Sequence, residues 1–194
     1  MVNKIPSELD NPINNIMYKQ IDTTLDTYNK MNFSPNTLTT ISLLFGLSGV
    51  YAVYNDYYKI GGIIFFLAYY FDCADGKFAR KYNKETIFGD YYDHISDFVK
   101  FSLMFYVLYF KLQSKSFKTK TILISILIIL LIFSILQFGC QEYVHDNKYS
   151  PTLSWTKKFI NTSNCEKQVK ITKYFSITTF ITYVCVVIFF WEYL

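Results

Sequence analysis

The sequence predicts an all-α protein, a polytopic bundle of transmembrane helices preceded by an amphipathic helix. Hydrophobic residues make up 52% of its 194 residues and charged residues only 18%, below the roughly 25% of soluble domains. Several apolar stretches approach the ~20 residues that a helix needs to cross a bilayer. One stretch, 122–138, is almost wholly Ile, Leu and Phe, so it lacks the polar face of a soluble surface helix. A bundle of soluble helices is therefore disfavoured.

The first 34 residues are expected to form an amphipathic segment, and residues 35–194 to form the membrane domain. Apolar residues recur at steps of three and four between Asn11 and Met31, which is the spacing of one helix face. This helix either lies on the membrane surface or packs against the bundle, and the sequence leaves both open. Ser34 followed by Pro35 is typical of a helix start, because serine caps and proline suits the first turn.

Five membrane helices are clear in the rest of the chain. They are expected at about 38–54, from 58 onward, and at 91–112, 122–138 and 174–191. The segment 141–173 is rich in lysine and holds few long apolar runs, so it is either a loop, an interfacial helix or a poorly apolar sixth span. The four cysteines form no C-x-x-C pair, and we expect them to be free thiols.

Basic residues predict the orientation of this multi-pass protein. Lys and Arg are concentrated in the N-terminal segment, in the connection 77–84 and in 141–173, which places these parts in the cytoplasm. The formal net charge of +4 and the lack of a dense basic stripe argue against nucleic acid as a partner. Basic residues beside apolar spans instead suit anionic membrane lipids.

An acidic pattern lies between the second and third spans. Spacings of three and four residues place side chains on one helix face, and two such faces occur here. The first holds Asp72, Asp75, Gly76 and Ala79, and the second holds Gly89, Asp93 and Asp97. The polar connection 81–88 is short enough to join two antiparallel helices. Four carboxylates are therefore expected to face one another near a membrane surface.

Four carboxylates at one place require either that some of them are protonated or that cations lie between them. Two like charges about 4 Å apart repel by about 4 kcal/mol at an effective dielectric of about 20. Aspartates without a soft ligand nearby suit Mg²⁺ or Mn²⁺, and a pair of such ions is a standard device of phosphoryl chemistry. Gly76, Ala79 and Gly89 leave space for a bulky ligand, and Arg80 offers a cationic fork for phosphate.

The complete pattern resembles the signature of the CDP-alcohol phosphotransferase (CDP-alcohol phosphatidyltransferase) family. That signature reads D-x-x-D-G-x-x-A-R-x8-G-x-x-x-D-x-x-x-D, and residues 72–97 match every fixed position, including the spacer. Pro-Asn-Thr-Leu-Thr at 35–39 is similar to the Pro-Asn-x-x-Thr start of the family's first membrane helix. The resemblance implies a core of six membrane helices with its active site near the cytoplasmic surface.

The resemblance also implies a site and a reaction. Two divalent ions, Mg²⁺ or Mn²⁺, would be bound by Asp72, Asp75 and Asp93, with Asp97 contributing. The catalytic general base would be Asp97. The CDP moiety would contact Gly76, Ala79 and Arg80, with Asn36, Thr39 and Gly89 beside them. The hydroxyl of a lipid or small-alcohol acceptor would attack the β-phosphorus, and CMP would leave. The resemblance further suggests a homodimer.

The transferred alcohol stays open between two branches of the family. The Gly89-Asp90 pair and the Asp93-His94 pair resemble the choline/ethanolamine phosphotransferase branch, which uses CDP-choline or CDP-ethanolamine and diacylglycerol. Members of that branch are usually much longer than this chain. The branches that use CDP-diacylglycerol and a small polar alcohol match the length better. We favour the aminoalcohol branch slightly, and His94 is equally explained as a histidine that packs beside the site.

Two other functions compete with the transferase. A non-catalytic membrane protein could retain a metal or nucleotide site, but all four aspartates and Arg80 are intact. A small cation transporter could use the acidic cluster, but it needs neither Gly76 nor Ala79, and Arg80 would oppose the passage of a cation. Binding of CDP separates the transferase from the transporter.

Overall fold

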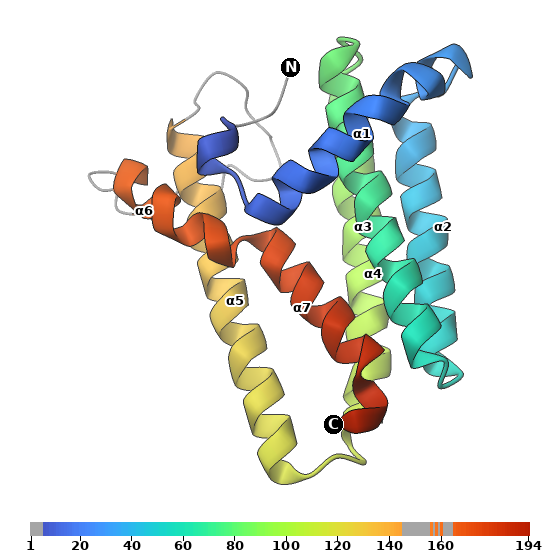
Figure 1. The fold of residues 1–194 in the computed structure, drawn as a ribbon, viewed down its shortest axis with the longest axis vertical. Helices are drawn as coiled ribbons and strands as arrows, with labels where there is room; N and C mark the ends of the chain where they lie inside the picture. The colour runs from blue at the N-terminus through green and yellow to red at the C-terminus, as the bar shows by residue number, and fades with distance from the viewer. Residues whose placement is uncertain (1–5, 145–155, 157, 159, 161–164) are drawn as a thin grey trace.

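The protein is a bundle of long helices with a shorter helix across one end (Figure 1). The computed structural model describes residues 6–144, 156, 158, 160 and 165–194, and these contain helices and turns but no strand. The helices are α1 (Pro12–Lys30), α2 (Pro35–Tyr54), α3 (Tyr58–Lys81), α4 (Ile87–Leu112), α5 (Phe117–Val144), α6 (Cys165–Thr172) and α7 (Ile177–Phe189). The prediction of an all-α protein is confirmed.

Three helical stretches are long and apolar enough to cross a membrane, namely Pro35–Tyr54, Phe117–Gln141 and Lys167–Phe189. The third combines α6 and α7 with the short turn between them. Helices α3 and α4 have 24 and 26 residues, which is sufficient length for a bilayer, but charged side chains lower their hydropathy. The count of five or six spans therefore stays a prediction.

The helix starts follow from local chemistry. Asn11 caps α1 by accepting a hydrogen bond from the Ile13 amide, and Ser34 caps α2 in a capping box with Thr37. Thr86 caps α4 by accepting from the Gly89 amide. Such a cap stabilises a helix by about 1 kcal/mol. The predicted helix start at Ser34 and Pro35 is confirmed.

Helix α1 lies across the end of α3 and presents its apolar face to the bundle. Met17, Ile21 and Leu25 are buried on that face, and Ile21 and Leu25 join Phe78 of α3 in one core cluster. Asp22 pairs with Lys77 at 2.7 Å. Of the two possibilities left open by the sequence, the structure therefore shows the amphipathic helix packed against the bundle.

Helices α2 and α3 form a tight antiparallel pair because glycine lies where they meet. A Cβ atom on Gly61 would approach Val53 Cγ2 to 2.5 Å, and one on Gly49 would approach the Phe65 amide nitrogen to 3.1 Å. The Ser42 hydroxyl also donates to the Ala68 carbonyl at 2.8 Å. These contacts fix how far α2 can slide along α3.

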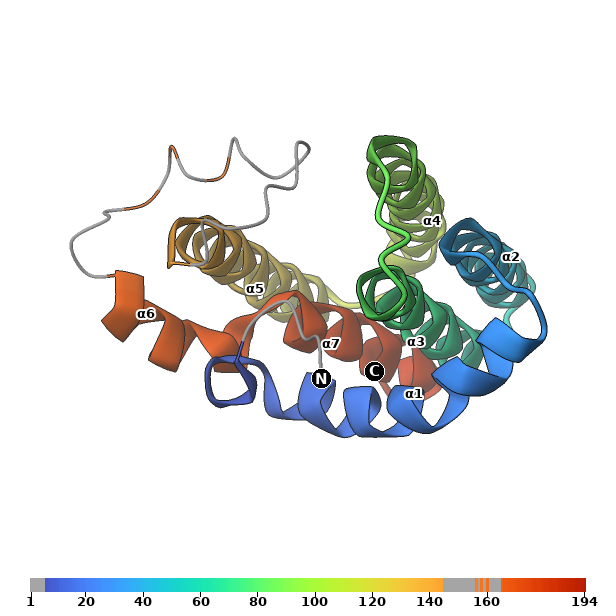
Figure 2. The same ribbon diagram turned by 90° about the horizontal axis from the view of Figure 1, so that it is seen from above.

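Helices α5, α6 and α7 form the other side of the bundle, and α5 stands apart from α4 when the bundle is viewed from above (Figure 2). Cys140 of α5 is bonded to Cys165 of α6. The expectation of four free thiols is therefore wrong for this pair and holds for Cys73 and Cys185. The two bonded cysteines are separated by 25 positions, so no short-range sequence pattern predicts this pair. About half of the lysine-rich segment 141–173 lies outside the described residues.

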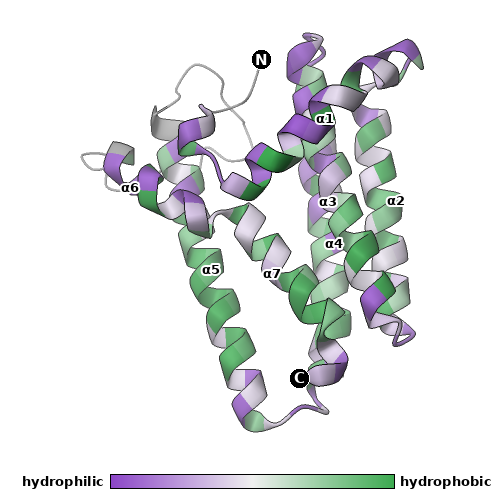
Figure 3. Ribbon diagram, in the orientation of Figure 1, coloured by the Kyte–Doolittle hydropathy of each residue, from purple (hydrophilic) through white to green (hydrophobic). Residues whose placement is uncertain are grey.

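Polar residues gather at the end of the bundle that α1 crosses, whereas α5 and α7 are mostly apolar (Figure 3). The second half of α3 and the first half of α4 belong to this polar end. All four aspartates of the motif lie there.

Candidate active site

Three aspartates from two helices converge between α3 and α4. Asp72 of α3 and Asp93 and Asp97 of α4 each offer one carboxylate oxygen, and these three oxygens lie within 4.8 Å of one another. Each side chain is partly buried. The helix faces predicted from residue spacing do therefore meet at this point.

This cluster fits a hard divalent ion. The Oδ1 atom of Asp93 is buried and has no hydrogen-bond partner among the described residues. A buried acceptor without a partner is costly, and a cation would satisfy it. Mg²⁺ binds oxygen at about 2.0–2.1 Å, so opposite ligands of one ion lie about 4.2 Å apart. The three oxygens would need to move together by less than about 1 Å to reach that geometry.

Asp75 lies beside the cluster and binds a second predicted residue. The Thr39 hydroxyl of α2 donates to Asp75 Oδ2 at 2.5 Å. Both side chains are buried, with Thr39 2% and Asp75 4% exposed. Asp75 is not among the three aspartates whose oxygens converge. Thr39, the last residue of the Pro-Asn-x-x-Thr sequence, thus contacts the acidic site through its hydroxyl.

The remaining predicted residues form two small groups, one on α3 and one between α2 and α4. The Arg80 guanidinium lies over Gly76. A Cβ atom added at Gly76 would lie 3.3 Å from Arg80 Nη1. On the facing helices, a Cβ atom on Gly89 would lie 3.3 Å from Asn36 Oδ1. Ala79 is partly buried on α3, one residue before Arg80. Glycine thus leaves space beside both Arg80 and Asn36.

Asp10, just before α1, is a buried carboxylate. Burial raises the pKa of the Asp10 carboxyl, and the positive charge of Arg80 acts in the opposite direction. Asp10 accepts hydrogen bonds from the Asn11 amide and from the Asn14 side chain. The positive charge of Arg80 therefore acts on a buried carboxylate outside the motif.

His94 makes a local contact. Its Nδ1 atom lies 2.7 Å from the Asp90 carbonyl oxygen, one turn earlier in α4. A carbonyl only accepts hydrogen bonds, so Nδ1 carries the proton in this arrangement. This contact matches a histidine that packs beside the site.

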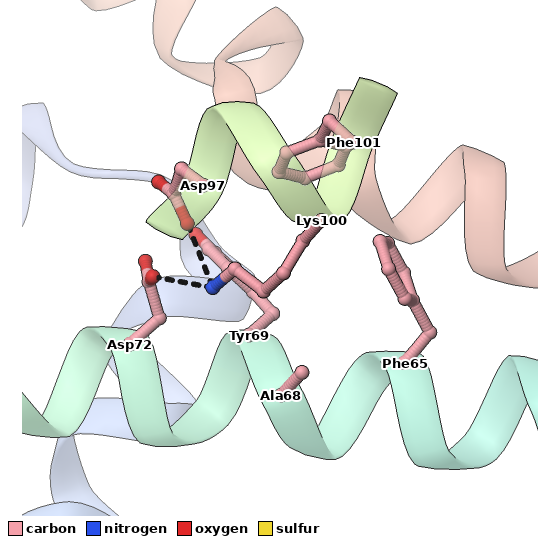
Figure 4. A pocket seen from close by; sticks show the side chains of 7 residues that line it. All are labelled: Phe65, Ala68, Tyr69, Asp72, Asp97, Lys100 and Phe101. Atoms are coloured by element: carbon pink, nitrogen blue, oxygen red, sulfur yellow. Dashed lines mark hydrogen bonds and ion pairs between the residues drawn. The ribbon is translucent and has the colours of Figure 1, made fainter. Parts of the chain in front are cut away.

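Lys100 is a residue of the site that the sequence motifs did not indicate. Its ammonium donates to Asp97 Oδ1 at 2.7 Å and to Asp72 Oδ1 at 3.1 Å (Figure 4), and to Ser42 Oγ at 2.6 Å. These three contacts use all three N–H donors of the ammonium. The side chain is 3% exposed and lines a small pocket with the aromatic rings of Phe65 and Phe101.

The signal for Lys100 was present in the sequence. Asp93, Asp97 and Lys100 are spaced 0, 4 and 7, so they share one face of α4. On α2, Ser42 and Gly46 are four residues apart and meet the lysine from the other side. A Cβ atom on Gly46 would lie 2.5 Å from Lys100 Cδ.

Comparison with known families agrees with this geometry. The family model for CDP-alcohol phosphatidyltransferase matches residues 32–194, which includes α2 to α7 and every predicted site residue. Neither the curated proteins nor the solved structures that were compared give a significant match. The matched region covers well over half of the chain and contains the convergent aspartates. The chain therefore belongs to the CDP-alcohol phosphatidyltransferase family and is a membrane phosphotransferase of phospholipid synthesis.

Proposed function

We propose that this enzyme transfers a phospho-alcohol group from a CDP-alcohol to a hydroxyl acceptor and releases CMP. The family implies a CDP-alcohol donor, an alcohol acceptor and divalent metal. The observation that carries the proposal is the convergence of the Asp72, Asp93 and Asp97 oxygens within 4.8 Å, with Arg80 eight residues after Asp72 on α3. This arrangement offers carboxylates for metal and a cationic fork for phosphate on the same two helices.

The residues of the proposed site have distinct roles. Asp72, Asp75, Asp93 and Asp97 hold two Mg²⁺ or Mn²⁺ ions, which when bound neutralise charge on the phosphate oxygens. Arg80 holds a phosphate of the CDP moiety, Gly76, Ala79 and Gly89 leave space for that moiety, and Asn36 and Thr39 contact it. Asp97 takes the proton of the acceptor hydroxyl as general base, and the acceptor oxygen replaces CMP on the β-phosphorus.

The donor is one of two classes. The aminoalcohol donors CDP-choline and CDP-ethanolamine pair with diacylglycerol, whereas CDP-diacylglycerol pairs with a small polar alcohol. We favour the aminoalcohol class slightly, on the Gly89-Asp90 and Asp93-His94 pairs. We further propose five or six membrane spans, an active site on the cytoplasmic side and a homodimer.

The test is release of CMP by the protein purified in detergent with Mg²⁺ or Mn²⁺. CDP-choline and CDP-ethanolamine are offered with diacylglycerol, and CDP-diacylglycerol with inositol, glycerol 3-phosphate or serine. We expect one donor to react, and Asp97→Asn to lower the rate by about a hundredfold or more. The matched control is Asp56→Asn. Asp56 is an exposed residue of the α2–α3 turn and pairs with Lys111, and this variant should release CMP at an unchanged rate. Failure of every donor to react, together with failure of CDP to bind, refutes the proposal.

A further inference from the structure

Lys100 is a buried cation inside the acidic cluster, at a position outside the family signature. It contacts two of the three aspartates whose oxygens converge. We infer that Lys100 is a positioning residue, the resident counter-cation of the cluster, which holds Asp72 and Asp97 together without metal and weakens the binding of divalent ions. The inference rests on the proposed function, because it concerns the same site.

The surroundings of Lys100 are built to hold an ammonium group. Its three acceptors come from three helices, with Ser42 on α2, Asp72 on α3 and Asp97 on α4. The Ser42 hydroxyl gives its proton to the Ala68 carbonyl, so it can only accept from the lysine. Gly46 leaves space for the aliphatic stem, which any side chain there would displace. The lysine is thus fixed along its whole length.

Lys100 acts in opposite directions on the empty and the metal-loaded cluster. Without metal, its positive charge offsets the repulsion among the carboxylates. When a divalent ion binds the same oxygens, the ammonium lies a few ångströms from a second cation and the two repel. Removing the charge should therefore destabilise the metal-free protein and tighten the binding of metal.

Lys77 is a matched comparison from the same bundle. Its side chain is also 3% exposed and pairs with one carboxylate, Asp22, at 2.7 Å. It also donates to the Tyr18 carbonyl at 3.0 Å. Neither partner belongs to the aspartate cluster. Replacing a lysine that has a purely structural role should destabilise the protein equally with and without metal.

The experiment compares Lys100→Met and Lys77→Met with the unmodified protein in detergent. Methionine keeps an unbranched stem and removes the charge. Mn²⁺ affinity is measured from the electron paramagnetic resonance signal of free Mn²⁺, and thermal unfolding is followed in EDTA and in saturating Mn²⁺. We expect Lys100→Met to bind Mn²⁺ about tenfold more tightly or better, to melt lower in EDTA and to gain more from Mn²⁺ than the unmodified protein does. Lys77→Met should melt lower in both conditions with unchanged Mn²⁺ affinity.

Two further variants keep the inference testable if Lys100→Met does not fold. Lys100→Arg keeps the charge and should leave Mn²⁺ affinity within about threefold of the unmodified value. Gly46→Ala displaces the stem of Lys100 and should raise the affinity. Unchanged or weaker Mn²⁺ binding in Lys100→Met or Gly46→Ala, in a protein that still releases CMP, overturns the inference alone. Absence of both Mn²⁺ binding and CMP release in the unmodified protein overturns the inference and the proposed function together.

Discussion

Replacing Thr39 by valine tests whether the α2 hydroxyl supports the acidic site. Valine has nearly the shape of threonine, so the change removes one hydrogen bond to Asp75 and leaves the packing intact. Thr39 is 2% and Asp75 4% exposed, so water cannot readily replace the lost donor. A hydrogen bond to a charged group contributes about 1.5–3 kcal/mol. For a chain of this length each kcal/mol corresponds to about 2–4 °C, and Tm should fall by about 3–12 °C.

The assay is thermal unfolding of Thr39→Val in detergent, together with the rate of CMP release. Thr39→Ser restores the hydroxyl and should recover most of both quantities. Thr40→Val is the neighbouring control, because the Thr40 hydroxyl contacts the Asn36 carbonyl and the Tyr92 hydroxyl instead of Asp75. A Tm within about 1 °C of the unmodified protein, less than about 0.5 kcal/mol on the same scale, would show that the Thr39 to Asp75 hydrogen bond does not stabilise this site.

Three other perturbations follow from the structure. EDTA should abolish CMP release and added Mg²⁺ or Mn²⁺ should restore it, because the Asp93 acceptor has no other partner among the described residues; release that persists in EDTA contradicts a metal-dependent site. Gly76→Leu places a bulky side chain against Arg80, whose Nη1 atom would lie 3.3 Å from a Cβ atom at position 76. The KM for the CDP donor should therefore rise about tenfold or more while Tm stays nearly constant. An unchanged KM would mean that the nucleotide binds elsewhere. Phe78→Ala empties a fully buried site between α1 and α3 and should cost about 3–5 kcal/mol in chemical denaturation, and a loss below about 1 kcal/mol would mean that α1 does not pack there.

Features set by neighbouring residues could be predicted from the sequence. The start of α2 follows from Ser34 and Pro35, whose chemistry acts within one helical turn. The meeting of Asp72 with Asp93 and Asp97 follows from helical spacing and a short connection. In both cases the interaction spans few residues, or the chain between the partners is too short to allow another arrangement.

Features that depend on how helices turn toward one another could not be predicted. The contact of Lys100 with Ser42 joins positions 58 residues apart, and it needs the rotation of α4 about its axis as well as the close approach that Gly46 permits. The bond between Cys140 and Cys165 likewise depends on where α6 returns to α5. Asp75 could be placed on the correct face of α3, but its contact with Thr39 required the register of α2 against α3.

The depth of the site in the membrane follows from helix lengths. From Tyr58 to Asp72, α3 rises about 21 Å, and from Asp97 to Leu112, α4 rises about 22 Å, at about 1.5 Å per residue. If both helices cross a hydrocarbon core of about 30 Å from these ends, the two aspartates lie at the same depth, within about 9 Å of the opposite surface. A polar headgroup can reach that depth from the nearer surface, while a lipid can reach it from within the bilayer. The backbone of Lys100 lies about one helical turn deeper, but its ammonium reaches back to Asp72 and Asp97. Its three acceptors satisfy a charge that would be costly at this depth if it were unpaired.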